Sequence, residues 1–384
     1  MRADAPPPLP APRGPLSSAL FSAWRRDDRS VRLAPPVGDG LTGEDLHLAL
    51  YACYELHYRG FDSVDDRWER HPEVVRITDL LEDIFESALR DEAGPCPVLP
   101  AGVHAALRDL ATSSGGPSLS AFVAEEADAE QVRELAIHRS LYQRKEADPH
   151  SWAIPRLSGR AKAALIEIQR DEYGEGRPGA SHAELFGDTM EALGLDPTYG
   201  AYLDVVPATT LATVNLISLL GRQRRLRGAL VGHLALFEMT SVGPMGRYAA
   251  GMRRLGLDGA APFYDIHVEA DAHHEVVAGR DLAQGLADDE PALAGDLLFG
   301  ARALMAVEGR FTAMLLDAWD RGESSLRPGA ASTMAAHGRV GTANGPKPAT
   351  RTDPKERPAR VARRDPGVDG AKRRAVPARA FGRL

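Results

Sequence analysis

The residues best suited to chemistry lie in one short stretch of the chain, residues 263–274. Positions three or four apart share one face of a helix, so His267, Asp271 and His274 would present two imidazoles and a carboxylate in one direction. His273 would point elsewhere. The pattern predicts most of a metal site on one helix, although a polar helix face with incidental histidines would have the same spacing.

A second group of polar residues flanks a predicted helix break. Gly174, Gly176, Pro178 and Gly179 interrupt the helical pattern, because glycine and proline disfavour helix interiors. Glu172 and His182 lie on either side and could converge across this break. An ordinary Gly-Pro turn with polar flanks is the alternative.

Two further carboxylates have settings that suggest a site. Glu146 stands at an apparent helix end, where we expect the nearby Asp148 and His150 to cap the helix or support a ligand rather than bind metal. Glu238 follows the apolar string Leu-Ala-Leu-Phe, which predicts that it points to the interior. An unpaired charge there costs several kcal/mol, so Glu238 needs a cation.

These segments together resemble the heme-oxygenase-like di-iron oxidases and oxygenases, which include the iron-containing redox enzymes. The resemblance covers residues 129–322 and rests on the strings Glu-Ala-Asp-Pro-His, Asp-Glu-Tyr-Gly-x-Gly-Arg-Pro and His-x3-Asp-x2-His. Within it, Glu146 corresponds to an additional carboxylate of some members, notably N-oxygenating ones. The metal ligands that the resemblance implies are Glu146, Glu172, His182, Glu238, His267, Asp271 and His274.

The resemblance implies an iron-dependent oxidoreductase that binds two Fe(II) per chain and uses O2 to oxidise a small molecule. N-oxygenation of an amine, desaturation and oxidative C–C cleavage all occur on this scaffold, and a non-catalytic helical binding protein is a further alternative. Imidazole and carboxylate donors without thiolate agree with non-heme iron. Such an enzyme could also need an external electron donor, and a second copy of the chain would be its partner in a homodimer.

Composition limits the remaining classes of function. The whole chain has 46 basic and 54 acidic residues, of which residues 328–384 hold 13 and 4, so residues 1–327 are strongly acidic. An acidic body repels nucleic acid and anionic membranes. The two cysteines, Cys53 and Cys96, form no CxxC pair, and we expect a cytoplasmic protein without disulfides. No apolar run is long enough to span a membrane.

The chain between its two ends has helical periodicity almost throughout. We expect an all-α, heme-oxygenase-like bundle at 129–327, an N-terminal helical extension at 41–128, and disordered tails at 1–40 and 328–384. The aromatic segment 51–61 is interpreted as N-terminal packing, or otherwise as a lid or dimer contact. The predicted helices are 43–59, 73–91, 101–111, 129–146, 157–173, 180–193, 208–221, 224–240, 244–255, 262–278 and 290–322.

Overall fold

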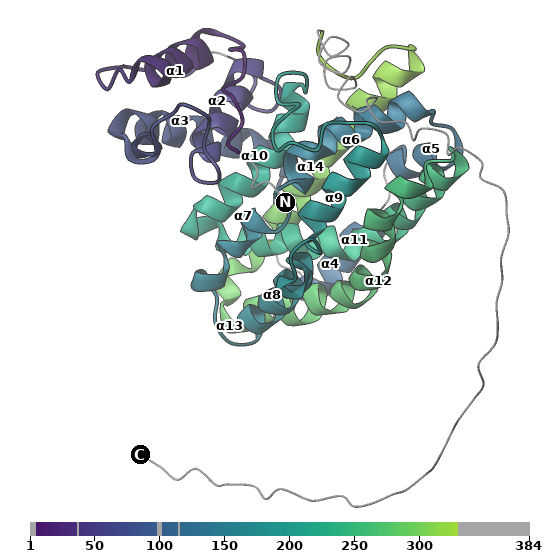
Figure 1. Cartoon of the computed structure of the whole chain (residues 1–384). Coiled ribbons are helices and arrows are strands. Elements are labelled where there is room, and N and C mark those ends of the chain that lie inside the picture. The colour runs from purple at the N-terminus through teal and green to yellow at the C-terminus, as the bar shows by residue number, and fades with distance from the viewer. Residues whose placement is uncertain (1–4, 37, 98–101, 114–115, 329–384) are drawn as a thin grey trace, which may run out of the picture. The chain divides into compact units, whose positions relative to one another are not determined.

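The computed structural model describes residues 5–36, 38–97, 102–113 and 116–328, and all regular elements in these ranges are helices (Figure 1). The predicted all-α fold class is therefore confirmed. The α-helices are α1 (Pro15–Arg26), α2 (Glu44–Glu55), α3 (Pro72–Ala93), α4 (Val103–Thr112), α5 (Leu119–Glu125), α6 (Ala129–Gln143), α7 (Asp148–Ser151), α8 (Gly159–Glu172), α9 (His182–Ala192), α10 (Ala208–Arg222), α11 (Arg227–Arg254), α12 (Pro262–Val276), α13 (Gly285–Asp289) and α14 (Ala294–Asp320). The shorter helical elements are η1 (Asp66–Arg70), η2 (Ile154–Arg156), η3 (Gly174–Gly176), η4 (Arg224–Leu226), η5 (Asp258–Ala260), η6 (Val277–Gln284) and η7 (Pro291–Leu293), of which η6 is a π-helix.

The centre of the bundle is formed by α10, α11 and α14. The segment 214–220 of α10, expected to lie near the centre, is buried at every position. Helices α11 and α14 lie so close together that a Cβ atom at Gly232 or Gly300 would overlap the backbone of the opposite helix. Helix α11 also packs along α12, so it links the core to the stretch that carries the predicted His-Asp-His stripe.

The prediction that residues 1–40 are disordered is wrong for residues 15–26, which form α1. Leu16, Leu20, Phe21 and Trp24 of this helix are all buried. The first turn is held by Asp45 of α2, whose carboxylate accepts hydrogen bonds from the backbone N–H groups of Leu16 and Ser17, each at 2.8 Å. The Pro- and Ala-rich flanks obscured the short amphipathic pattern of this helix. The stability of α1 comes from its tertiary packing.

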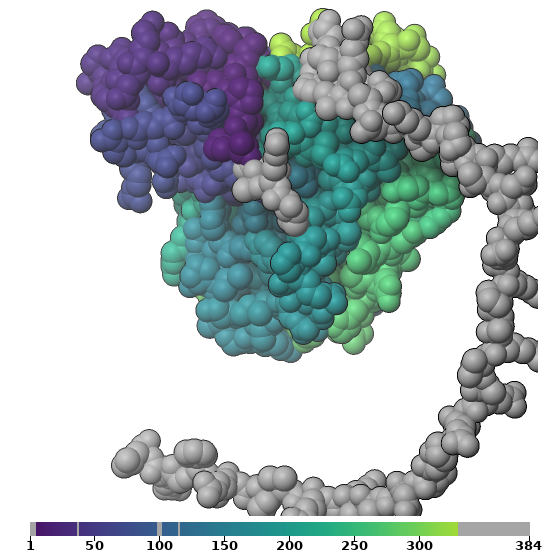
Figure 2. All heavy atoms as spheres, viewed as in Figure 1, coloured from purple at the N-terminus to yellow at the C-terminus, as the bar shows by residue number. Residues whose placement is uncertain are grey.

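The helices of the N-terminal extension share one core with the rest of the bundle. Helix α2 packs against α10 and α3 against α14. Figures 1 and 2 show this purple and blue end of the chain lying directly against the teal part of the bundle. Tyr51, Tyr54 and Phe61 of the aromatic segment are buried in that core. The predicted boundary at residue 129 coincides with the start of α6, but it does not divide the hydrophobic core.

The two helices predicted at 224–240 and 244–255 are one continuous helix, α11, with Pro244 inside it. Proline removes one backbone donor and usually ends a helix. Here the helix is held on several sides by α5, α12 and α14, and this packing offsets the local cost. The polar and glycine residues around Pro244 therefore gave a false helix end.

The predicted basic tail, 328–384, lies outside the described residues except for Pro328. Among the helices in the described ranges, none combines the length and the apolar character needed to cross a membrane.

Candidate metal centre

Helix α12 points His267, Asp271 and His274 toward the interior, where each is at most 3% exposed. The Nδ1 atom of His267 lies 2.7 Å from the backbone oxygen of Phe263, so Nδ1–H donates to that carbonyl. Nε2 is then the ring nitrogen that faces the site and could bind a metal ion. His273 lies on the outer face, paired with Glu167 at 2.7 Å, in agreement with the sequence prediction.

His274 is oriented in a similar way by Asp171 at the end of α8. Its Nε2–H donates to Asp171 Oδ2 at 3.1 Å. This leaves Nδ1 facing Glu238 Oε2 at 3.4 Å and Asp271 Oδ1 at 3.5 Å. A histidine fixed through one ring nitrogen by a carboxylate is the arrangement that metal-ligating histidines usually show.

Glu172 and His182 meet across the predicted helix break, because α8 ends at Glu172 and α9 begins at His182. Their Oε2 and Nδ1 atoms are 2.7 Å apart. Ser181 caps α9 and forms a capping box with Glu184. The turn requires glycine at residue 174, where φ is +59° and a Cβ atom would clash with the backbone of Ala180.

Glu146 lies in the turn between α6 and α7 and is only 5% exposed. Its Oε2 is 3.7 Å from His267 Nε2. The next residue, Ala147, has a φ of +73°, a conformation that costs a non-glycine residue about 1–3 kcal/mol and occurs often at functional sites. The main chain is thus bent immediately after a carboxylate that faces the site.

The other polar residues of this turn make their hydrogen bonds to side chains outside the predicted ligand set, although His150 also lines the cavity among the donor atoms. Asp148 accepts a hydrogen bond from the Tyr173 hydroxyl at 2.9 Å, and His150 Nε2 lies 3.3 Å from His233 Nδ1. Neither contact caps a helix or involves a predicted ligand, so the expected capping or supporting role of Asp148 and His150 stays a prediction.

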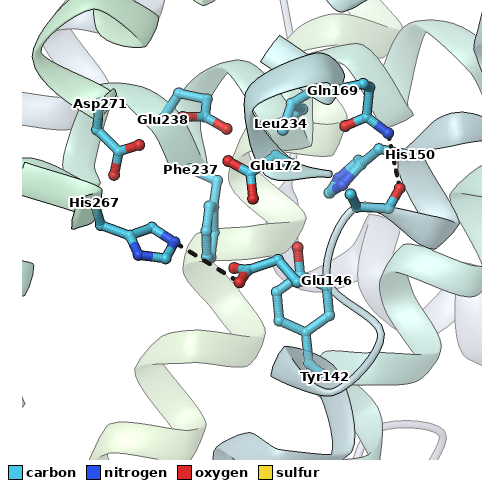
Figure 3. A pocket seen from close by; sticks show the side chains of 11 residues that line it. Tyr142, Glu146, His150, Gln169, Glu172, Leu234, Phe237, Glu238, His267 and Asp271 are labelled. Carbon is cyan, nitrogen blue, oxygen red and sulfur yellow. Dashed lines mark hydrogen bonds and ion pairs between the residues drawn. The ribbon is translucent and has the colours of Figure 1, made fainter. Parts of the chain in front are cut away.

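The described residues contain two groups of donor atoms close enough to hold ions, with the atoms of each group within 4.8 Å of one another. Glu172 belongs to both. Glu238 belongs to neither, but it is 4% exposed and touches His274. Figure 3 shows Glu172 between His267 and Asp271 on one side and His150 on the other, with Glu146 below it. The first group is Glu146, Glu172, His182 and His267, and the second is Glu172, Asp271 and His274.

A pair of metal ions fits these residues. Six of the seven predicted ligands carry a buried donor or acceptor atom that makes no hydrogen bond of acceptable geometry, although two of these atoms, Glu172 Oε2 and His182 Nδ1, lie only 2.7 Å apart. Leaving such atoms unsatisfied costs roughly 1–3 kcal/mol each, and their position in one cluster fits the binding of cations. The atoms are Glu146 Oε2, Glu172 Oε2, His182 Nδ1, His267 Nε2, Asp271 Oδ1 and His274 Nδ1.

Burial and mutual charge perturb these groups strongly. Burial raises the pKa of Glu172 to about 7 and that of Glu238 to about 8, and it lowers the pKa of His182 to about 4. Burial also acts to lower the pKa of His267, but Glu146 and the other carboxylates outweigh it and raise that pKa to about 10. Protons must balance the carboxylates when no metal is bound, and a divalent cation would replace them.

The fold and the site define an all-helical protein with a buried cluster of imidazole and carboxylate groups that could bind metal. Residues 133–309 match the sequence model of a family described as iron-containing redox enzyme. This match confirms the resemblance predicted from the sequence and indicates an oxidoreductase. No match was found among curated proteins.

Sequence reasoning missed the residues that shape the cluster from outside. Asp171, which orients His274, lies in the quoted Asp-Glu-Tyr-Gly string but was not assigned a role. Tyr142 and Phe237 line the cavity between the donor atoms, and both look like ordinary apolar helix positions in the sequence.

Proposed function

We propose that the protein is a non-heme di-iron oxidase or oxygenase that uses O2 to oxidise a small molecule. The observation that carries the proposal is the position of Glu172, whose carboxylate is common to two groups of buried donors. A carboxylate shared in this way would help to hold two ions and would offset their charge. Bound Fe(II) would supply the electrons that reduce dioxygen.

The seven ligands in this proposal are those implied by the sequence, with Glu238 completing the second group through its contact with His274. N-oxygenation of an amine is the candidate reaction that the position of Glu146 supports, because Glu146 contributes to the first group. An external electron donor would return the metals to the reduced state between turnovers.

The test is the iron content of the full chain after anaerobic loading with Fe(II), measured by elemental analysis. We expect about two Fe per chain in the wild type. Glu172→Ala should lower the content markedly, whereas His273→Ala, which alters the outer face of α12, should leave it unchanged. A wild-type chain without iron, or an undiminished content in Glu172→Ala, would refute the proposal.

Oxygen reactivity is tested with the same preparation by stopped-flow mixing with O2. We expect the loaded wild type to consume O2 and to give a transient visible absorption band. Iron binding without any reaction with O2 would instead identify a metal-binding protein that is not an oxidase.

A further inference from the structure

The turn that carries Glu146 is held in an unfavourable conformation. Ala147, the next residue, has a φ of +73° and a ψ of −34°, a combination that residues other than glycine rarely adopt. Such a conformation persists only where the surrounding structure enforces it. The contacts that hold Ala147 therefore also determine where the Glu146 carboxylate points.

Gln169 makes a side-chain contact that holds this turn. Its Nε2 atom donates to the main-chain oxygen of Ala147 at 2.9 Å, and Figure 3 marks this bond with a dashed line. The same oxygen accepts a hydrogen bond from the Ser151 N–H group at 3.0 Å. The Ala147 carbonyl is thus fixed from two directions, by α7 and by α8.

Gln169 also belongs to the helix that supplies Glu172. The two residues are three positions apart in α8, so they lie on the same helix face, and both are buried. They line the cavity among the donor atoms together with Glu146 and Ala147. One hydrogen bond therefore joins the turn that carries Glu146 to the helix that carries Glu172, the residue common to both groups of donors.

The amide nitrogen of Gln169 has no donor left for a ligand. Its second N–H group donates to the Ser151 hydroxyl oxygen at 2.8 Å, and an amide nitrogen has only two hydrogens. The partners also fix the orientation of the amide, because a main-chain oxygen only accepts and must face the nitrogen. Gln169 is therefore suited to hold the turn and not to bind a substrate.

Ser151 is itself held by Tyr173, the residue that directly follows Glu172. The two hydroxyl oxygens lie 2.8 Å apart. Gln169, Ser151 and Tyr173 thus form a chain of hydrogen bonds that leaves α8, crosses α7 and returns to the end of α8. A side chain whose own position is locked in this way can orient a neighbouring group precisely.

We propose that Gln169 is a positioning residue for Glu146, which it directs toward the metal centre by holding the Ala147 carbonyl. The inference rests on the proposed function, since it takes Glu146 to be a metal ligand. Without the Gln169 donor, the turn loses a bond that keeps Ala147 from relaxing to a more favourable φ. The Glu146 carboxylate would then sample other directions, and the first group of donors would bind metal less tightly.

The test measures the binding of Co(II) to the full chain, because Co(II) can occupy iron sites and has visible absorption bands that respond to its ligands. Gln169→Met keeps the approximate size of the side chain and removes the donor. It should weaken the binding of one of two ions about tenfold, as expected for a group that orients a ligand, and it should change the Co(II) spectrum. The ion held without Glu146 should bind as in the wild type.

Gln143→Met is the matched control. Gln143 is also a buried glutamine close to this turn, 5% exposed, but it does not line the cavity among the donor atoms. This variant should bind both ions as the wild type does. Gln169→Asn keeps an amide on a shorter side chain, so it should show a smaller loss of affinity than Gln169→Met. It replaces Gln169→Met if that variant does not fold.

A double-mutant cycle separates positioning from a general loss of stability. Glu146→Ala removes the carboxylate that Gln169 would position. Adding Gln169→Met to Glu146→Ala should therefore cause no further loss of Co(II) affinity, whereas a structural role elsewhere would make the two losses add. Urea denaturation of each variant measures the change in stability separately.

Additive losses, wild-type Co(II) binding by Gln169→Met, or an equal loss in Gln143→Met would overturn the proposal. A wild-type chain that binds neither Fe(II) nor Co(II) would overturn it together with the proposed function. The cycle itself needs no O2. A non-additive loss in a protein that does not react with O2 would retain the role of Gln169 and refute the proposed oxidase or oxygenase.

Discussion

Lys145 and Glu55 form an ion pair in the interior of the protein, with 3.0 Å between Nζ and Oε2 and at most 1% of either side chain exposed. The Tyr199 hydroxyl lies 2.8 Å from both oxygens of Glu55. The Lys145 ammonium also lies over the ring of Tyr58, 4.3 Å from its centroid. This pair ties α2 to the residue immediately before Glu146.

Removing one partner of this pair should destabilise the fold strongly. Lys145→Met leaves the Glu55 carboxylate buried and unpaired, which typically costs about 3–5 kcal/mol. We expect this loss in the free energy of unfolding, measured by urea denaturation. The double variant Lys145→Met, Glu55→Leu removes both charges and should recover most of it; a double variant as unstable as the single one would contradict this account.

Asp171 and Glu167 of α8 provide a matched pair for the role of second-sphere groups. Asp171 contacts the buried His274, whereas Glu167 contacts the exposed His273. Asp171→Asn should weaken Fe(II) binding about 10- to 100-fold, because it replaces the charged acceptor that orients a ligating imidazole with a neutral amide. Glu167→Gln should bind Fe(II) as the wild type does. Equal affinities of the two variants, measured by competition with a chelator, would exclude this role for Asp171.

Local patterns explain which parts of this site were predictable. His267, Asp271 and His274 lie on one helix, so helical periodicity alone placed them on one face. Glu172 and His182 could be paired because glycine and proline mark the turn between them. These two groups of residues, together with Glu146 and Glu238, come together only through the packing of α6, α8, α9, α11 and α12. The full set of seven ligands was therefore predicted from the family resemblance and not from local patterns.

Long-range relationships were not readable from the sequence. The partners Glu55 and Lys145 are 90 residues apart, and neither has a local pattern that indicates a buried charge. The cavity of about 370 Å³ that Tyr142 and Phe237 line depends in the same way on helices from distant parts of the chain. The wrong helix end at Pro244 and the missed α1 have one cause, since tertiary packing overrode the local signals.

Acid should destabilise the protein through buried neutral histidines. Burial lowers the pKa of His138 to about 3. As the pH falls below about 6.5, the unfolded chain gains a proton at this residue that the folded chain does not, so stability falls with pH until about pH 3. Between pH 7 and pH 5 this one residue should cost about 2 kcal/mol.

The variant His138→Gln isolates that contribution. Glutamine does not titrate in this range and can still bond to Thr210, which His138 Nδ1 contacts at 2.7 Å. The loss of unfolding free energy from pH 7 to pH 5 should therefore be smaller in the variant than in the wild type by about 2 kcal/mol. Identical losses in urea titrations at the two pH values would show that His138 is protonated in the folded state.

The last prediction concerns Glu146, on which the choice among reactions depends. Its Oε2 atom is buried without a hydrogen bond and faces His267. If Glu146 is a ligand, its negative charge would stabilise the oxidised metals. This would favour oxidation of a nucleophilic nitrogen of the substrate. Glu146→Ala should then keep the helical fold and bind some iron through the other six residues. The transient absorption band formed with O2, however, should decay at a different rate or reach a different amplitude.

The alternative role for Glu146 is structural, as a group at a helix end before Pro149. Loss of a helix cap costs roughly 0.5–2 kcal/mol of stability and would leave the oxygen reaction unchanged. The two roles are distinguished by stopped-flow traces of wild type and Glu146→Ala at matched iron loading, with urea denaturation of both proteins as the control. Superimposable traces would remove the basis for preferring N-oxygenation over desaturation or C–C cleavage, because Glu146 would then contribute nothing to the oxidising step.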